Sequence, residues 1–322
     1  MARSDLLISL VKAGTSGDLG LFRKVVETVI AEERAKKHEV LASRLADELK
    51  RNGTPTVVSR PLISNNGTAH DLCVETTPSR TIEDLVLPDI VRTACRELVE
   101  EHHRGELLRS YGMKPRNRIL LAGSPGNGKT SLAESIAHGL MVPFIVVRYD
   151  GLIASYLGET ALRLRRLFDY VRTRSCVLFF DEFDTIGKER GDEHETGEIK
   201  RVVSSLLLQV DDLPTHVVVI AATNHPELLD RAVWRRFQIR LELPSPTRDQ
   251  TVEFFEKVVA RIDIPFGYTP RMIAEKLHGV SYSELEDFMA DVARRYVLSL
   301  PEPDAKKIIA ERLEQWKKRF NA

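Results

Sequence analysis

The sequence predicts an α/β fold: a five-stranded parallel sheet covered by helices, then a C-terminal helical domain, with a short all-helical region in front. Two observations lead to this prediction. Between residue 81 and Pro244, five strongly apolar runs alternate with helix-like stretches, and near-continuous apolar strands are typical of parallel sheets buried on both faces. After Pro244 no strand-like run remains. The apolar runs are "RILLA" (118–122), "PFIVVR" (143–148), "CVLFFD" (176–181), "VVVIAAT" (217–223) and "FQIRLEL" (237–243).

The first element, residues 1–52, is expected to be helical because apolar residues recur at helical spacing in two stripes. This pattern is equally compatible with two roles for the region. It could pack as an extra layer on the main domain, or it could bind a partner. The stripes comprise Leu21, Val25 and Val29 with Phe22, Val26 and Ile30, and then Leu41, Leu45 and Leu49.

Residues 53–80 change in character and are expected to form a linker. Three prolines and the turn signal Asn66-Gly67 separate short β-prone runs, which favours one small hairpin within the linker. The α/β domain is then predicted over residues 81–244 and the C-terminal helical domain over 245–322.

Composition narrows the class of protein. The chain has 322 residues, with 47 basic and 47 acidic side chains, so its net charge offers no electrostatic reason to expect nucleic acid or an anionic membrane as main partner. Three widely spaced cysteines indicate reduced thiols instead of a disulfide framework. The apolar start is too short for a signal peptide, and no segment approaches a ~20-residue membrane span. A soluble, cytoplasmic protein is therefore expected.

The motif "GSPGNGKT", residues 123–130, follows a predicted strand and opens a predicted helix. In that context it predicts a phosphate-binding loop, called the phosphate loop below. Its glycines let backbone N–H groups turn toward phosphate. Lys129 supplies a positive charge to the β- and γ-phosphates, and Thr130 offers a hydroxyl to magnesium. A glycine-rich turn without function is disfavoured by the full eight-residue match.

Two carboxylates, Asp181 and Glu182, end the buried run "VLFFDE". Ligands of open α/β sheets bind at the carboxyl ends of strands, so Asp181 is expected to hold the magnesium ion through its water shell. Glu182 is expected to orient or deprotonate the attacking water. Asn224 follows another strand and is expected at the same edge, contacting the γ-phosphate and that water. Helix capping is the alternative role for Asn224.

Adjacent Arg235 and Arg236 precede the last predicted strand. Two neighbouring arginines usually belong to a solvated surface. The alternative is an arginine finger acting on the nucleotide of another subunit, an effect worth ~10³–10⁵ in rate. The pair's own sequence is compatible with both.

Together these motifs resemble an AAA+ ATPase of the AAA clade proper, from about Thr81 to residue 300. "GSPGNGKT" is similar to Walker A, "VLFFDE" to Walker B, and "AATNHPELLDRAVWRRF" to the clade's second region of homology. The resemblance implies a P-loop NTPase fold with a helical lid, ATP and Mg²⁺ as cofactors, and ATP hydrolysis. It makes Asn224 sensor 1 and the two arginines trans-acting fingers.

The resemblance also assigns other positions. "TIEDLVLPDIVRTACRELV" is similar to the segment before Walker A whose backbone cups adenine, with Val86 and Leu87 as nominal contacts. Tyr156 and Leu157, in "SYLGE", match the aromatic-hydrophobic loop that grips substrate in the ring's pore. "VDDLP" departs from the clade's usual signalling turn, which leaves Asp211 without an assigned role. The residues implied in binding nucleotide are Gly123, Ser124, Pro125, Gly126, Asn127, Gly128, Lys129, Thr130, Ser131, Asp181, Val86 and Leu87.

The family implies a homo-oligomer, a hexameric ring in which each site takes residues from two protomers. A narrower resemblance, based on "LFRKVVETVIAEERAKKHEVLASRLA" and on overall size, is to the ATPase half of bacterial IetAS-type modules. Those modules pair an AAA protein with a subtilisin-like serine protease in plasmid incompatibility and phage defence.

Three functions follow as hypotheses. The first is a motor that grips and remodels protein substrates, feeding or activating a separate protease. The second is an ATP-gated switch that licenses a partner without threading, in which Tyr156 simply packs under the next helix. A DNA-acting machine is the third, disfavoured by neutral charge and by the lack of a sensor 2 arginine in "GVSYSELEDF".

Overall fold

The computed structural model describes Val26, Thr28 and Ile30 and residues 72–149, 157–184, 205–261, 267–277, 279–301 and 303–320. The chain divides into two units, Met1–Pro61 and Leu62–Ala322, and the architecture below is that of the second unit. In the first, the three described residues are helical. The rest of the predicted region 1–52, and linker residues 53–71, lie outside the described part.

The sheet has the strand order β1-β3-β4-β5-β2-β6. All five predicted runs form strands, and β2 to β6 pair in parallel. The prediction of five strands was one short, because β1 pairs antiparallel with β3. Only Cys73 of β1 is buried, so this edge strand lacks the apolar run by which buried strands are recognised. The strands are β1 (Cys73–Thr76), β2 (Arg118–Ala122), β3 (Phe144–Val147), β4 (Cys176–Phe180), β5 (Val217–Thr223) and β6 (Ile239–Glu242).

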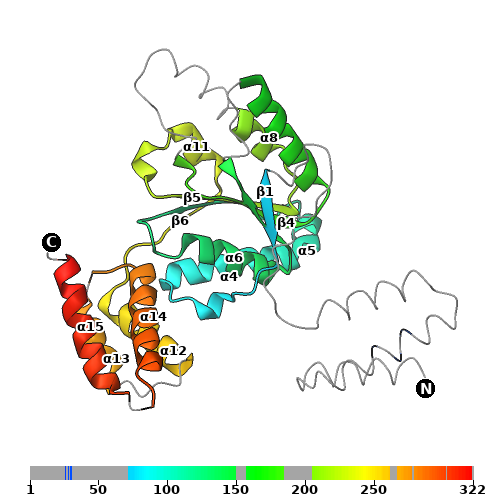
Figure 1. Cartoon of the computed structure of the whole chain (residues 1–322). Coiled ribbons are helices and arrows are strands. Elements are labelled where there is room, and N and C mark those ends of the chain that lie inside the picture. The colour runs from blue at the N-terminus through cyan, green and yellow to red at the C-terminus, as the bar shows by residue number, and fades with distance from the viewer. Residues whose placement is uncertain are drawn as a thin grey trace. The chain divides into compact units, whose positions relative to one another are not determined.

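Helices cover both faces of this sheet, as Figure 1 shows. Because side chains alternate along a strand, successive residues of β2 enter different cores. Ile119 and Leu121 pack in a cluster with α4 and α6, whereas Leu120 packs in a cluster with α8 and helical residues 205–211. The helical elements of this domain are η2 (Ile82–Asp84), α4 (Asp89–His103), α5 (Gly105–Ser110), α6 (Lys129–Leu140), α8 (Leu157–Arg172), η3 (Pro226–Leu228) and α11 (Arg231–Arg236).

The described residues of the C-terminal region form helices joined by turns, with no strand among them, as predicted. It comprises α12 (Arg248–Arg261), α13 (Pro270–Lys276), α14 (Tyr282–Leu298) and α15 (Ala305–Phe320). These helices share a separate core built around Phe255, Phe288 and Trp316. None of the described helices combines the length and apolar character that a membrane span requires.

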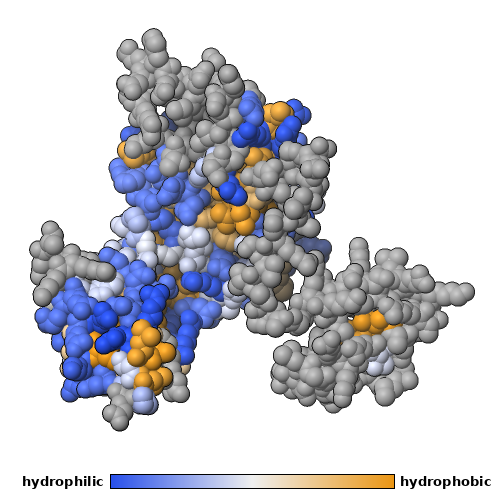
Figure 2. Space-filling view, viewed as in Figure 1, coloured by the Kyte–Doolittle hydropathy of each residue, from blue (hydrophilic) through white to orange (hydrophobic). Residues whose placement is uncertain are grey.

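The surface turned toward the viewer in Figure 2 is largely hydrophilic where it is described, with smaller apolar areas. Exposed large apolar side chains include Val297, Leu298 and Leu300, at and just beyond the end of α14. All three cysteines are buried, and no disulfide joins any two of them.

Candidate active site

The phosphate loop joins the carboxyl end of β2 to the start of α6. Gly123, Gly126 and Gly128 all have positive φ angles, of 150°, 77° and 82°, which L-residues with a side chain rarely adopt. No side chain caps the start of α6. The first amides of that helix therefore face the loop, an arrangement that favours an anion such as phosphate.

Replacing Gly123 with alanine is expected to unfold or displace the phosphate loop. A Cβ atom at this position would lie 2.2 Å from the carbonyl oxygen of Leu243, a backbone atom of the segment after β6, which cannot rotate away. We expect a loss of at least about 2 kcal/mol in the free energy of unfolding, measured by urea denaturation. Gly112→Ala is the control, because Gly112 also has a positive φ but has open space around its Cβ position. An equal loss in both variants would contradict the packing argument.

Lys129 ties the phosphate loop to the neighbouring strand. Its Nζ atom donates hydrogen bonds to the carbonyl oxygens of Gly123 (2.7 Å) and Ser124 (3.0 Å) and to Oδ1 of Asn224 (2.6 Å). Burial lowers the pKa of Lys129, and the negative charges of Asp181 and Asp184 oppose that effect. The ammonium group thus lies between the loop and the carboxylates that follow β4.

Thr130 and Asp181, both predicted at the magnesium site, lie in hydrogen-bond contact. The Thr130 hydroxyl donates a hydrogen bond to Oδ2 of Asp181 at 3.1 Å. A hydroxyl and a carboxylate side by side are the oxygen ligands that Mg²⁺ prefers, so these two residues fit a magnesium ion beside the phosphate loop. Glu182 is exposed and adopts a φ of 47°, and its backbone N–H donates to Oδ1 of Asp181 at 3.0 Å.

Asp184 is a site residue that the sequence interpretation missed. This carboxylate is buried, and its Oδ1 atom accepts hydrogen bonds from the Thr223 hydroxyl (2.8 Å) and the Asn224 N–H (3.3 Å). It therefore orients Asn224, which in turn accepts from Lys129. The available signal was a third acid in "DEFD", directly after a buried strand.

The arginine pair lies at the opposite end of the strands from the phosphate loop. Arg235 and Arg236 end α11, before β6, and β6 pairs in parallel with β2 from Ile239 opposite Ile119. The pair is therefore at the amino end of the strands, away from the phosphate loop at their carboxyl end. Asp211 forms ion pairs with both Arg236 and Arg118. Arg235 is exposed, and no hydrogen bond or ion pair joins it to another described residue.

The segment 81–87, which includes the predicted adenine contacts, joins the two domains. Val86 is buried in the lid core, and its neighbour Leu87 is buried in the α/β core. Their side chains are thus occupied in packing, so an adenine ring would have to be recognised through the backbone of the segment. This packing is compatible with the predicted contact through the backbone, which stays a prediction.

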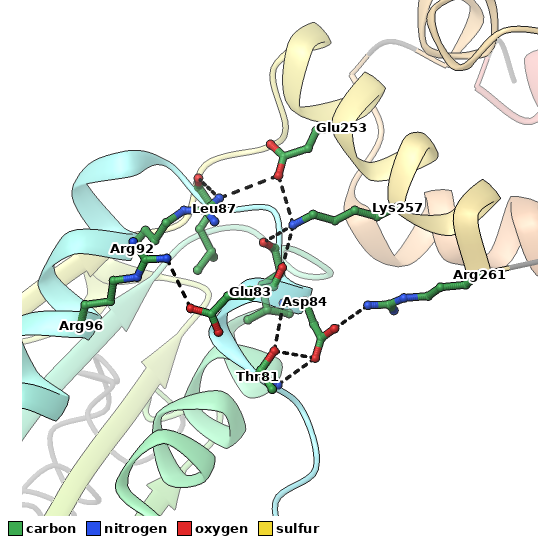
Figure 3. A network of polar contacts seen from close by, with 10 residues as sticks. Thr81, Glu83, Asp84, Leu87, Arg92, Arg96, Glu253, Lys257 and Arg261 are labelled. Carbon is green, nitrogen blue, oxygen red and sulfur yellow. Dashed lines mark hydrogen bonds and ion pairs between the residues drawn. The ribbon is translucent and has the colours of Figure 1, made fainter. Parts of the chain in front are cut away.

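Figure 3 shows how lid helix α12 holds this segment. Lys257 donates to the carbonyl oxygens of Glu83 (2.9 Å) and Leu85 (3.0 Å), and Arg261 forms an ion pair with Asp84 at 2.6 Å. The pKa of Asp84 is lowered, mainly by hydrogen bonds from Thr81. The lid is therefore attached to the same segment that precedes the phosphate loop in the chain.

The lid also contacts the phosphate loop directly. The Ser283 N–H donates to the Gly126 carbonyl oxygen at 3.0 Å, and a Cβ on Gly126 would lie 2.7 Å from Oγ of Ser281, the N-cap of α14. Movement of α14 would consequently move the loop.

The other loop residues occupy varied surroundings. Ser124 and Pro125 are exposed, whereas Asn127 is buried, with its amide 3.5 Å from the Leu243 carbonyl oxygen. Ser131 accepts a hydrogen bond from Arg80 at 2.9 Å.

The predicted gripping residues are only partly covered by the structure. Tyr156 lies outside the described residues. Leu157 is the first residue of α8, and its side chain lies outside the described part.

Comparison with known proteins agrees with this geometry. The model of the family "ATPase family associated with various cellular activities (AAA)" matches residues 119–245. An AAA family ATPase of Sinorhizobium fredii, y4kL, is 37% identical over 291 residues, 89% of this chain and 87% of that protein.

Two further relatives are similar over smaller shares of their length. A Methanothermobacter thermautotrophicus protein, named as a homologue of a 26S proteasome regulatory subunit, is 29% identical over 74% of this chain and 64% of its own. The peroxisomal ATPase PEX6 of Kluyveromyces lactis is 35% identical over 60% of this chain and 21% of its own. The match to the family model and the extent of the match to y4kL show that this chain belongs to the AAA family of ATPases.

Proposed function

We propose that this AAA protein hydrolyses ATP in a ring of identical subunits and uses the cycle to grip and remodel protein substrates. One observation carries the assembly in this proposal: the phosphate loop and Arg235–Arg236 lie at opposite ends of the parallel strands β2 and β6. Strands of four or five residues separate the ends, roughly 13–17 Å. An arginine cannot span that distance back to its own nucleotide, but a neighbouring copy can present its phosphate loop to it.

Each side chain has a proposed role in hydrolysis. The phosphate loop and Lys129 bind the phosphates, and Thr130 and Asp181 hold magnesium, which neutralises charge on the phosphate oxygens. Glu182 activates the attacking water, and Asn224 orients it. Arg235 is the principal finger, because it is exposed and unengaged among the described residues, whereas Arg236 is anchored by Asp211.

Two observations support the proposal, one for assembly of subunits and one for a protein substrate. The exposed apolar side chains Val297, Leu298 and Leu300 are suited to contact with another subunit. The relative whose name refers to a 26S proteasome regulatory subunit favours a protein substrate.

A narrower proposal is that a subtilisin-like serine protease is the partner, in plasmid incompatibility or anti-phage defence. It is supported by the N-terminal sequence, and co-purification of a protease with the chain would test it.

The remodelling proposal is tested with Tyr156→Ala. An aromatic side chain that grips substrate by its bulk can be removed without touching the nucleotide, so we expect ATP turnover within about twofold of wild type and complete loss of unfolding. The measurement is loss of fluorescence from green fluorescent protein carrying an unstructured tail. The control is Tyr111→Ala, which removes another tyrosine, 75% exposed, at the end of α5.

Unchanged unfolding by Tyr156→Ala would contradict the gripping role. Nucleotide-dependent assembly of the wild-type protein with no unfolding at all would instead favour the ATP-gated switch that licenses a partner without threading.

A further inference from the structure

Lys257 of lid helix α12 is hydrogen-bonded to the backbone of the segment 81–87, which is called the joining segment below. Its ammonium group donates to the carbonyl oxygens of Glu83 (2.9 Å) and Leu85 (3.0 Å), as Figure 3 shows. The side chain also pairs with Glu253, one turn earlier on the same helix, at 3.1 Å. A single cation of the lid thus fixes two carbonyl groups of the joining segment.

Lys257 is the stronger of two links between α12 and the joining segment. The second is the ion pair of Arg261 with Asp84, whose side chains are 60% and 39% exposed, against 28% for Lys257. Water screens an exposed ion pair, so such pairs contribute little to stability. Hydrogen bonds from a half-buried ammonium group lose less to water and are worth more. Of the contacts with α12, those of Lys257 therefore hold the joining segment most firmly.

Val86 follows the anchored carbonyl groups, and its own backbone is unpaired. The residue is 7% exposed, and its side chain lies in the lid core. Neither its N–H nor its C=O group forms a hydrogen bond with a described residue, whereas the carbonyl oxygen of Leu87 accepts from Arg92. Backbone groups of buried residues are nearly always paired, so a free donor and a free acceptor on one buried residue call for a ligand.

The free groups of Val86 match the edge of one nucleobase. Adenine carries an amino donor at N6 beside an acceptor at N1, which can meet a backbone C=O and N–H together. Guanine has an acceptor at O6 and a donor at N1, so each would face a group of its own kind.

The joining segment also starts beside the phosphate loop. Arg80, the residue before the segment, donates to the Ser131 hydroxyl in the first turn of α6 at 2.9 Å. This adjacency favours a nucleotide with its base at Val86 and its phosphates in the loop.

We propose that Lys257 is a positioning residue for nucleotide binding, which holds the joining segment so that the Val86 N–H and C=O select adenine over guanine. The proposal rests on the proposed ATPase function, because it concerns the nucleotide of the same site. Lys257 acts through the backbone of the segment, so it affects the base and leaves the phosphate-binding role of Lys129 untouched. Base selectivity then depends on a lid residue 174 positions along the chain from Glu83.

The test is Lys257→Met, which keeps an unbranched side chain but removes the donor. We expect the Kd for ATP to rise about 10-fold, as on losing hydrogen bonds from a charged group. The Kd for GTP should stay unchanged, so the preference for ATP falls by the same factor. Competition of each nucleotide with a fluorescent ATP analogue measures both constants. Lys307→Met is the control, because Lys307 is an exposed lysine on lid helix α15. A Kd for ATP within about twofold of wild type would overturn the proposal.

Inorganic tripolyphosphate separates positioning of the base from a general effect on the lid. It carries the phosphates of ATP but no base, so its Kd should be the same in wild type and in Lys257→Met, as should the melting temperature. Equal losses for ATP and tripolyphosphate, or for ATP and GTP, would mean that the substitution destabilises the lid, and would overturn the positioning role.

The same measurements separate this proposal from the function on which it rests. Wild-type protein that binds and hydrolyses ATP but binds GTP equally well would overturn base selection by Val86 and leave the ATPase intact. Wild-type protein that binds neither nucleotide nor tripolyphosphate would overturn both.

Discussion

Replacing Glu182 with glutamine is expected to leave ATP binding intact and to slow hydrolysis by about 10²–10⁴-fold, the usual contribution of a general base. Glutamine keeps the size of the side chain and one of its acceptor oxygens but cannot accept the proton of the attacking water. The phosphate loop, Lys129 and the Thr130–Asp181 pair remain in place to bind nucleotide. Phosphate release and binding of a fluorescent ATP analogue measure the two effects separately.

Because the variant retains ATP, it should also accumulate as a ring. Size-exclusion chromatography with ATP is expected to show an oligomer for Glu182→Gln that is larger and longer-lived than that of wild type. Glu256→Gln is the matched control, since Glu256 is an exposed glutamate on α12. A monomer under these conditions would contradict the shared active site, and normal turnover would contradict the role of Glu182.

Replacing Arg235 with alanine is expected to reduce turnover by about 10³–10⁵-fold, the range measured for arginine fingers, without loss of ATP affinity. Arg236→Ala should have the smaller effect on the chemical step. The Arg236 guanidinium is already paired with Asp211. Removing it should therefore mainly change the ion pair between Asp211 and Arg118. Arg231→Ala, at the exposed start of the same short helix, is the control.

Mixing two inactive variants tests action across the interface. A Glu182→Gln subunit has an intact arginine, and an Arg235→Ala subunit has an intact glutamate. In a mixed ring some interfaces combine the two functional residues, so activity is expected to recover in the mixture. No recovery, in a ring shown to contain both variants, would mean that Arg235 does not act on a neighbour. Full activity of both single arginine variants would mean that the two arginines are ordinary solvated surface residues with no role in hydrolysis.

Part of the candidate site follows from residues that are close in the sequence. The phosphate loop was predictable because a glycine-rich turn between a strand and a helix depends mainly on local backbone conformation. The same holds for Asp181 and Glu182, since an acid pair ending a buried apolar run must emerge at a strand end. Parallel pairing then places Asn224 at the same edge. The apolar runs also identified all five parallel strands.

Contacts between residues far apart in the chain were not predictable in this way. β1 was missed because an edge strand exposed to solvent carries no continuous apolar signal. Asp211 acquires a role only through its pairing with Arg118 and Arg236. Similarly, Val86 and Leu87 look like equivalent apolar neighbours, yet one enters the lid core and the other the sheet core.

The physical reason is the range of the forces involved. Turn geometry, helix starts and strand periodicity depend on neighbouring residues, so the identities of Gly123, Lys129 and Glu182 already indicate nucleotide chemistry. Burial and pairing depend on which surfaces meet when the sheet, its helices and the lid pack together. That packing brings Asp184 into hydrogen-bond contact with Asn224 and anchors Arg236 through Asp211.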